Sequence, residues 1–310
     1  MYTEFYNLNE NPFDLTPSPH YLYLSETHRE ALALLKYGVM ERKGFILLTG
    51  EVGTGKTTMV KTLLAGLDEN VQCIYVSNPR LTPKEFLEYL SLSVFKNREP
   101  FQSKARFLIA FEAFLQLLEK RGENFILIVD EAQNLSYGLL EDIRLLSNLE
   151  SNDRRLMSIF LVGQPELNQK LSQPRCRPIL QRISMRYHIE PLNRKETGQY
   201  VAERFKIAGK TDETDIFTNR ALAALHKYSN GYPRMINVLA DGALLLGYSE
   251  EKNVVTPSMV KASYKDAQIK SRERTKMPLW KWAITVAALL LLAVALAITK
   301  TGKNLLTSIF

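Results

Sequence analysis

The chain has 310 residues, enough for two compact units, since domains usually contain about 100–200 residues. Its content of 45% hydrophobic and 24% charged residues is typical of a globular protein with a real core. Six basic and two acidic residues between Tyr264 and Lys281 carry +4 of the net charge of +7, which argues against a nucleic-acid-binding surface spread over a whole domain. The two cysteines, Cys73 and Cys176, have no metal-binding spacing and suit a reducing cytoplasm.

Residues 1–192 are predicted to alternate strands with helices. Short apolar segments predict strands at 45–49, 71–77, 125–129, 157–162 and 186–189. Amphipathic segments predict helices at 57–67, 83–95, 104–120, 139–149 and 166–171. Because such alternation is typical of a parallel sheet covered on both faces, the expected fold class is α/β. An N-terminal arm precedes the first strand, and in it His28 is expected to be a packing or helix-capping residue.

A phosphate-binding loop is predicted directly after the first strand, where residues 50–57 have the sequence GEVGTGKT and match G-x-x-x-x-G-K-[ST]. The glycines let successive backbone N–H groups point at phosphate oxygens, and the following helix adds the positive end of its dipole. Lys56 is expected at the β- and γ-phosphates, and Thr57 as a hydroxyl ligand of Mg²⁺. The residues expected to bind ATP are Gly50, Glu51, Val52, Gly53, Thr54, Gly55, Lys56, Thr57 and Thr58.

The second part of the site is predicted where the apolar segment 126–129 ends in Asp130 and Glu131. Parallel strands present their carboxyl ends to ligands at one edge of the sheet. Asp130 is expected to hold Mg²⁺ through water, and Glu131 to polarise the attacking water as general base. Together the two motifs predict a protein that binds and hydrolyses Mg-ATP.

Two further positions are candidates for catalysis. Gln164 follows the strand at 157–162 and is expected to orient the attacking water, although a plain turn residue would also fit. Four arginines lie within residues 175–186, and they either form a solvated basic face or supply an arginine finger to a neighbouring subunit. Arg182 is the favoured finger because it follows an apolar pair at a helix end, with Arg186 and Arg177 as reserves.

Residues 193–270 are predicted to form a small helical lid, with helices at 194–208, 216–228, 233–246 and 257–269. The third helix begins with the sequence Gly-Tyr-Pro-Arg, which ends at Arg234. Since a helix N-terminus normally prefers acidic residues, Arg234 calls for a specific explanation. It is expected to reach the γ-phosphate as a second sensor and to couple the nucleotide state to the angle of the lid.

Residues 282–299 are uncharged and apolar, and at ~1.5 Å per residue they span roughly 27 Å, close to a bilayer core of about 30 Å. A single transmembrane helix is therefore predicted, after a basic juxtamembrane linker at 271–281 and before a short tail at 300–310. Trp280 and Trp282 mark one membrane interface. The preceding basic residues predict a cytoplasmic ATPase part and a tail outside.

The order of loop, Asp-Glu strand, polar sensor, arginine-bearing turn and Gly-x-Pro-Arg lid resembles an AAA+ ATPase. More narrowly, the chain resembles the general secretory pathway component A (ExeA-type) family over about residues 1–298. The segments that carry this likeness are 5–8, 11–13, 16–19, 23–25, 28–32, 44–45 and 161–167. The resemblance implies a P-loop AAA+ fold, a homo-oligomer such as a ring, and an inner-membrane ATPase that helps an envelope-spanning secretion, pilus or exopolysaccharide machine to assemble.

Relatives of the secretin-assembly kind usually carry a periplasmic peptidoglycan-binding domain after the membrane helix. Here only residues 300–310 follow the predicted membrane helix, so a short form of the family without that domain is expected. The expected setting is the bacterial inner membrane, with envelope assembly proteins rather than nucleic acid as partners. Two other functions stay open. One is a DNA-binding AAA+ regulator similar to transposition target-selection ATPases, which the apolar segment and the localised charge disfavour. The other is a nucleotide-gated scaffold with little turnover.

Overall fold

The structure is a computed structural model that describes residues 2–16, 19–96, 103–151, 154–210 and 215–275. The chain divides into two compact units, Met1–Val260 and Lys261–Phe310, and each is described by itself. The first unit holds every residue predicted to bind or cleave ATP.

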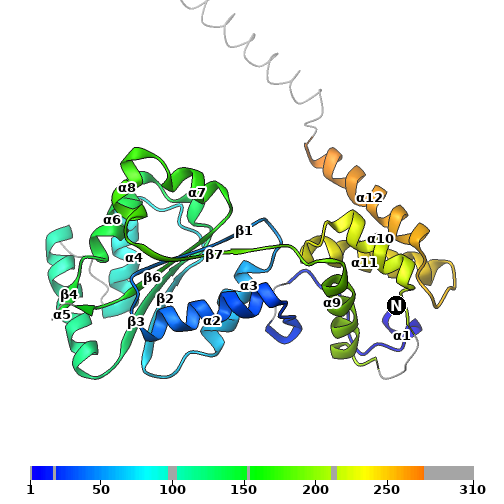
Figure 1. The fold of residues 1–310 in the computed structure, drawn as a ribbon, viewed down its shortest axis with the longest axis horizontal. Helices are drawn as coiled ribbons and strands as arrows, with labels where there is room; N and C mark the ends of the chain where they lie inside the picture. The colour runs from blue at the N-terminus through cyan, green and yellow to red at the C-terminus, as the bar shows by residue number, and fades with distance from the viewer. Residues whose placement is uncertain (1, 17–18, 97–102, 152–153, 211–214, 276–310) are drawn as a thin grey trace, which may run out of the picture. The chain divides into compact units, whose positions relative to one another are not determined.

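Five parallel strands form the main sheet, in the order β2-β3-β6-β1-β7 (Figure 1). Their bounds are β1 Phe45–Gly50, β2 Val71–Val76, β3 Asn124–Val129, β6 Ser158–Gly163 and β7 Ile183–Ile189. All neighbouring pairs in this sheet are parallel, so the carboxyl ends of the strands meet at one edge. The predicted α/β class is confirmed, and a strand lies at each of the five predicted segments.

One strand differs from its prediction, because β7 begins three residues before the expected segment at 186–189. It lies at the end of the sheet, where its side chains alternate between half-buried and exposed positions until Ile189. A strand covered on one face alone needs apolar residues only at alternate positions, and this weaker pattern hides its start in the sequence.

Helices pack on both faces of the sheet. Ile46 and Leu48 of β1 pack with α2 Glu26–Met40 and α3 Lys56–Ala65, whereas Phe45 and Leu47 pack with the helices of the other face. Those helices are α4 Pro83–Phe95, α5 Lys104–Lys120, α6 Tyr137–Leu146, α7 Glu166–Leu171 and α8 Arg177–Leu180. Because successive side chains of a strand point to opposite faces, one buried strand supplies both cores.

Short elements complete this part of the chain. They are α1 Tyr2–Phe5, the 3₁₀ helices η1 Pro19–Tyr21, η2 Ala132–Asn134 and η3 Pro174–Cys176, and the antiparallel pair β4 Glu150–Ser151 and β5 Arg154–Arg155. The helix α2 lies outside the helices predicted from the sequence. It begins after Ser25, whose Oγ accepts a hydrogen bond from the backbone N–H of His28 at 3.3 Å and so caps the helix.

Three helices follow β7 in the first unit, at the place of the predicted lid, and are called the lid helices here: α9 Arg194–Ile207, α10 Asn219–Ser229 and α11 Pro233–Ser249. The last described helix is α12 Pro257–Thr275. The N-terminal arm packs on the lid helices. The ring of Phe13 is edge-on to that of Phe205 at 5.3 Å, and the backbone N–H of Asn9 donates to the carbonyl of Ala208 at 2.8 Å. The arm is therefore fixed to the lid.

No helix within the part of the chain that the structure describes is both long and apolar enough to cross a membrane. The predicted transmembrane segment at 282–299 and the tail at 300–310 lie outside the described residues. The membrane helix therefore stays a prediction.

Candidate active site

The phosphate-binding loop connects the end of β1 at Gly50 to the start of α3 at Lys56. Two of its glycines have left-handed backbone angles, with φ 85° at Gly53 and 96° at Gly55. A Cβ atom at Gly53 would also lie 2.9 Å from the Cβ of Arg234. Position 53 therefore needs glycine for two reasons: other residues rarely adopt this backbone conformation, and any side chain would collide with Arg234.

Lys56 is folded back onto its own loop. Its Nζ donates to the carbonyl of Gly50 at 2.7 Å and to that of Glu51 at 2.9 Å. Burial lowers the pKa of the Lys56 ammonium, and the carboxylates of Glu131 and Asp130 oppose this shift. The buried ammonium is held where phosphate oxygens can replace the loop carbonyls as its partners.

Asp130 receives two hydroxyl donors from different elements. Thr57 Oγ1 donates to its Oδ2 at 2.8 Å, and Tyr75 of β2 donates to the same oxygen at 3.0 Å. Carboxylate and hydroxyl oxygens are the ligands that Mg²⁺ prefers, so the pair Thr57 and Asp130 fits the predicted metal site. Tyr75 is a member of this cluster that the sequence patterns missed. Its only signal is a place near the carboxyl end of the strand next to β3.

Glu131 follows Asp130 in a left-handed backbone conformation, with φ 51°. Its own backbone N–H donates to Asp130 Oδ1 at 2.8 Å, which fixes the turn. Gln164 Nε2, at the end of β6, donates to Glu131 Oε2 at 3.1 Å. The structure thus brings the predicted base and the predicted water sensor into direct contact, because β6 lies beside β3 in the sheet.

A cavity of about 340 Å³ lies between the loop and the lid. It is lined by Lys56, Thr57 and Glu131 from the elements next to the sheet, and by Arg234, Tyr200 and Arg204 from the lid helices. A smaller adjoining cavity shares Tyr200 and Arg204 and is bounded by Tyr21, Leu22 and Tyr23 of the arm. The arrangement suits a nucleotide whose phosphates lie on the loop and whose base lies between arm and lid.

Arg234 enters this cavity from the first turn of α11. Its backbone N–H donates to the carbonyl of Gly53 at 3.3 Å, so the lid touches the phosphate-binding loop directly. The turn before α11 is also held by a backbone hydrogen bond, since the carbonyl of Gly231 accepts from the N–H of Leu192 at 3.0 Å. Gly231 has a left-handed backbone angle, φ 75°. A Cβ at Gly231 would lie 1.9 Å from the Leu192 carbonyl oxygen. This contact sets where Arg234 lies.

Arg182 lies at the opposite edge of the sheet. It precedes β7, whose first residue, Ile183, is aligned with Phe45 at the start of β1. Gly50 is five residues further along β1, or about 17 Å at roughly 3.3 Å per residue. Arg182 therefore does not reach the loop of its own chain, and its role as a finger stays a prediction.

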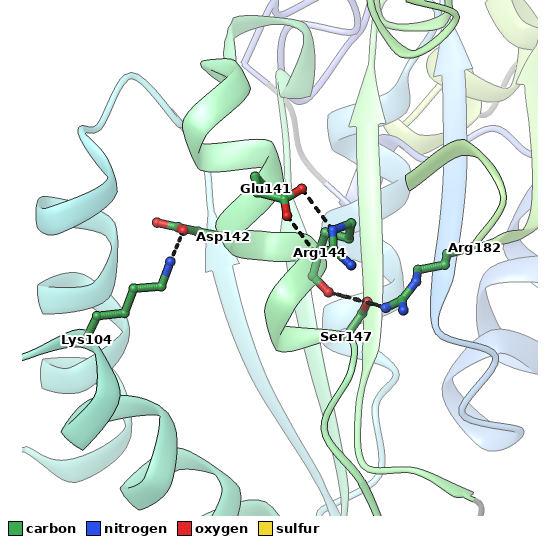
Figure 2. A network of polar contacts seen from close by, with 6 residues as sticks. All are labelled: Lys104, Glu141, Asp142, Arg144, Ser147 and Arg182. Atoms are coloured by element: carbon green, nitrogen blue, oxygen red, sulfur yellow. Dashed lines mark hydrogen bonds and ion pairs between the residues drawn. The ribbon is translucent and has the colours of Figure 1, made fainter. Parts of the chain in front are cut away.

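Figure 2 shows how Arg182 is held. Its Nη1 donates to Ser147 Oγ at 3.0 Å and to the carbonyl of Arg144 at 3.5 Å, both at the end of α6. Arg144 is paired in turn with Glu141 by two hydrogen bonds of 2.6 and 2.8 Å. Of the reserve candidates, Arg177 is exposed, and the exposed Arg186 donates to the carbonyl of Leu180 at 3.3 Å.

His28 supports the phosphate-binding loop from behind. It is buried, and its Nε2 lies 2.9 Å from the carbonyl oxygen of Thr54 while its Nδ1 lies 2.5 Å from Ser25 Oγ. Because a carbonyl only accepts, Nε2 carries the proton and Nδ1 accepts from the serine hydroxyl. Burial lowers the pKa of this imidazole, which favours its neutral form. His28, which was predicted to be a packing or helix-capping residue, thus also supports the phosphate-binding loop through its hydrogen bond to Thr54.

Comparison with known proteins identifies the fold and the family. A family model described as an AAA domain matches residues 39–171. General secretion pathway protein A of Aeromonas hydrophila is 42% identical over 252 residues, which cover 80% of this chain and 45% of that protein. This chain therefore spans about half the length of that relative.

Solved structures share the fold at low identity. Cdc6p of Pyrobaculum aerophilum aligns with a TM-score of 0.61 and 17% identity, over 81% of this chain and 70% of that one. The ORC2 protein of Aeropyrum pernix aligns with a TM-score of 0.56 and 20% identity, over 83% of this chain and 71% of that one. RuvB of Thermotoga maritima aligns with a TM-score of 0.52 and 16% identity, over 78% of this chain and 68% of that one. With its AAA domain and its secretion-pathway relative, the chain is an AAA+ P-loop protein of the general secretion pathway protein A (ExeA-type) family.

Proposed function

We propose that this protein is a membrane-anchored ATPase whose cycle of Mg-ATP binding and hydrolysis drives or regulates assembly of an envelope-spanning secretion, pilus or exopolysaccharide machine. The observation that carries the proposal is the 42% identity to general secretion pathway protein A over 252 residues. That alignment is long enough to include both the sheet and the lid. It supports a shared role beyond the fold.

In the proposed reaction, the loop from Gly50 to Thr57 binds the phosphates and Lys56 neutralises the β- and γ-phosphates. Thr57 and Asp130 would hold Mg²⁺, which supplies charge neutralisation of the phosphates. Glu131 accepts a proton from the attacking water while Gln164 orients that water. Support comes from the hydrogen bond of 3.1 Å that joins Gln164 to Glu131.

The lid and a second subunit complete the proposed cycle. Arg234 contacts the γ-phosphate from the lid, and its link to Gly53 would transmit a change of lid angle to the loop. Arg182 of one subunit would stabilise transition-state charge in the site of its neighbour. A homo-oligomer is therefore part of the proposal, and its ring size is left open.

Purified Glu131→Gln and Lys56→Ala variants test the site. Glu131→Gln should bind ATP normally and release phosphate at least ~10²-fold more slowly, the low end of what general-base catalysis contributes. Lys56→Ala should lose ATP binding. Fluorescent ATP affinity and phosphate release are the two measurements. Normal phosphate release by Glu131→Gln would show that another acid is the base, and Glu51 within the loop would be tested next.

Extraction of membranes tests the cellular setting. The protein should stay in the membrane pellet at high salt and leave it only in detergent, because an apolar segment is not released by screening of charge. Release by high salt alone would favour the DNA-binding alternative, since contacts to phosphate are strongly salt-dependent. Proteins that co-purify after solubilisation would then identify the envelope machine.

A further inference from the structure

Gln133 joins the proposed base to the proposed sensor. Its Nε2 donates to Glu131 Oε2 at 2.5 Å, and its Oε1 accepts from the backbone N–H of Gln164 at 3.1 Å. Gln164 Nε2 donates to the same oxygen of Glu131 at 3.1 Å. The three residues form a closed ring of hydrogen bonds across the carboxyl ends of β3 and β6.

The surroundings fix the side chain of Gln133 in this ring. A Cβ at Gly163 would lie 2.7 Å from Gln133 Oε1, so only glycine there lets the side chain cross to β6. Lys170 of α7 donates to the carbonyls of Gln133 at 2.6 Å and Leu135 at 2.7 Å. A half-buried cation thus anchors the turn that carries Gln133.

A carboxamide is suited to this position because one side chain donates and accepts at once. Both donors to the Glu131 carboxylate go to Oε2, which limits rotation of the carboxylate and leaves Oε1 as the oxygen for water. The link from Gln133 Oε1 to the backbone of Gln164 also means that the turn after β3 and the end of β6 are tied together.

We propose that Gln133 is a positioning residue for ATP hydrolysis, which sets the direction of the Glu131 carboxylate and makes base and sensor move together. This inference rests on the proposed role of Glu131 as the base. Gln133 acts through Glu131 and does not itself touch the substrate.

Two variants separate positioning from folding. Gln133→Met keeps the length of the side chain and removes both hydrogen bonds, whereas Gln133→Glu keeps the acceptor for Gln164 and removes the donor to Glu131. In both, kcat should fall about 10- to 100-fold, the effect of one or two hydrogen bonds, while fluorescent ATP affinity stays within about twofold of wild type. The exposed Gln169 of α7 gives the matched control, and Gln169→Met should behave as wild type.

A double variant tests the route of action by single-turnover phosphate release. Adding Gln133→Met to Glu131→Gln should cause no further loss, because the group through which Gln133 acts is already absent. A further loss, a full-rate Gln133→Glu, or weakened ATP binding in both single variants would overturn the proposal. Phosphate release by Glu131→Gln at the wild-type rate would instead overturn the assignment of the base, and this proposal with it.

Discussion

Replacing His28 by alanine should weaken ATP binding although the side chain never meets the nucleotide. The imidazole bridges Ser25 Oγ and the carbonyl of Thr54, and it lies directly behind Gly55, where an added Cβ would be 3.2 Å from Nε2. Without it, the loop loses the contact that holds its Thr54 peptide. The loop must then be ordered by ATP itself.

The expected magnitudes follow from these contacts. Each hydrogen bond contributes about 1 kcal/mol net, and a buried side chain is removed as well, so His28→Ala should lower the free energy of unfolding by about 2–4 kcal/mol. The one bond made to the loop accounts for about 1 kcal/mol of ATP binding, which corresponds to roughly a fivefold weaker Kd.

Urea denaturation and fluorescent ATP titration measure the two effects. His20→Ala is the matched control, because the side chain of His20 is 64% exposed and pairs with Glu10 at 3.4 Å at the surface. It should change neither quantity. An unchanged ATP affinity in a folded His28→Ala variant would contradict the proposed support of the loop by His28, since the loop would then hold its shape without the imidazole.

The same histidine predicts a pH dependence of stability. Burial lowers the pKa of His28 below its ordinary value of about 6.5, against the attraction of the Thr54 carbonyl and Glu196. Between the folded and unfolded values the unfolded chain binds the proton and the folded chain does not. Stability from neutral His28 is therefore full above about pH 6.5 and is lost as the pH falls through the folded value. His28→Gln should lose less stability than wild type between about pH 7.5 and 5.5, and equal losses would contradict the assignment.

Three further predictions concern subunits, arm and membrane. Arg182→Ala should bind ATP normally but hydrolyse it at least ~10²-fold more slowly, and mixing it with Lys56→Ala should restore part of the activity in assemblies that exchange subunits. Mixtures as inactive as both parents would place the finger elsewhere. Arg204→Met should free the arm, because Arg204 Nη1 donates to the carbonyl of Pro12 at 2.7 Å, so chymotrypsin should cut the arm faster than in wild type. A cysteine introduced at Thr307 should react with an impermeant thiol reagent in intact spheroplasts. Labelling only after lysis would reverse the predicted topology.

The sequence alone predicts those parts of the site that lie within one short segment. The loop up to Thr57 and the pair Asp130 and Glu131 each occupy consecutive positions next to an apolar strand, so motif and context appear together. Arg234 is also predicted from one short segment, because the glycine and proline just before it indicate the start of its helix. Local backbone rules are enough to place these residues in the fold, and their roles stay predictions.

His28, Tyr75 and Gln133 could not be assigned in this way. His28 reaches the loop from a residue separation of 26, and Tyr75 reaches Asp130 from a separation of 55. Such contacts depend on which helix packs behind β1 and which strand lies next to β3. A single sequence contains no periodicity that encodes either choice. Gln133 lies only two residues from Glu131, but its role depends on the absence of a side chain at Gly163 on another strand.

The order of the strands explains why Gln164 and Glu131 meet. In the chain, β6 follows both β1 and β3, yet in the sheet it lies between them. Its register places Val162 opposite Leu48 and Leu161 opposite Val129, so its carboxyl end lies between the phosphate-binding loop and the acidic pair. A side chain at the end of β6 therefore faces both halves of the site, whatever its type. In that position the amide of Gln164 donates to Glu131 Oε2 at 3.1 Å, on the strand that separates the loop after β1 from the acidic pair after β3.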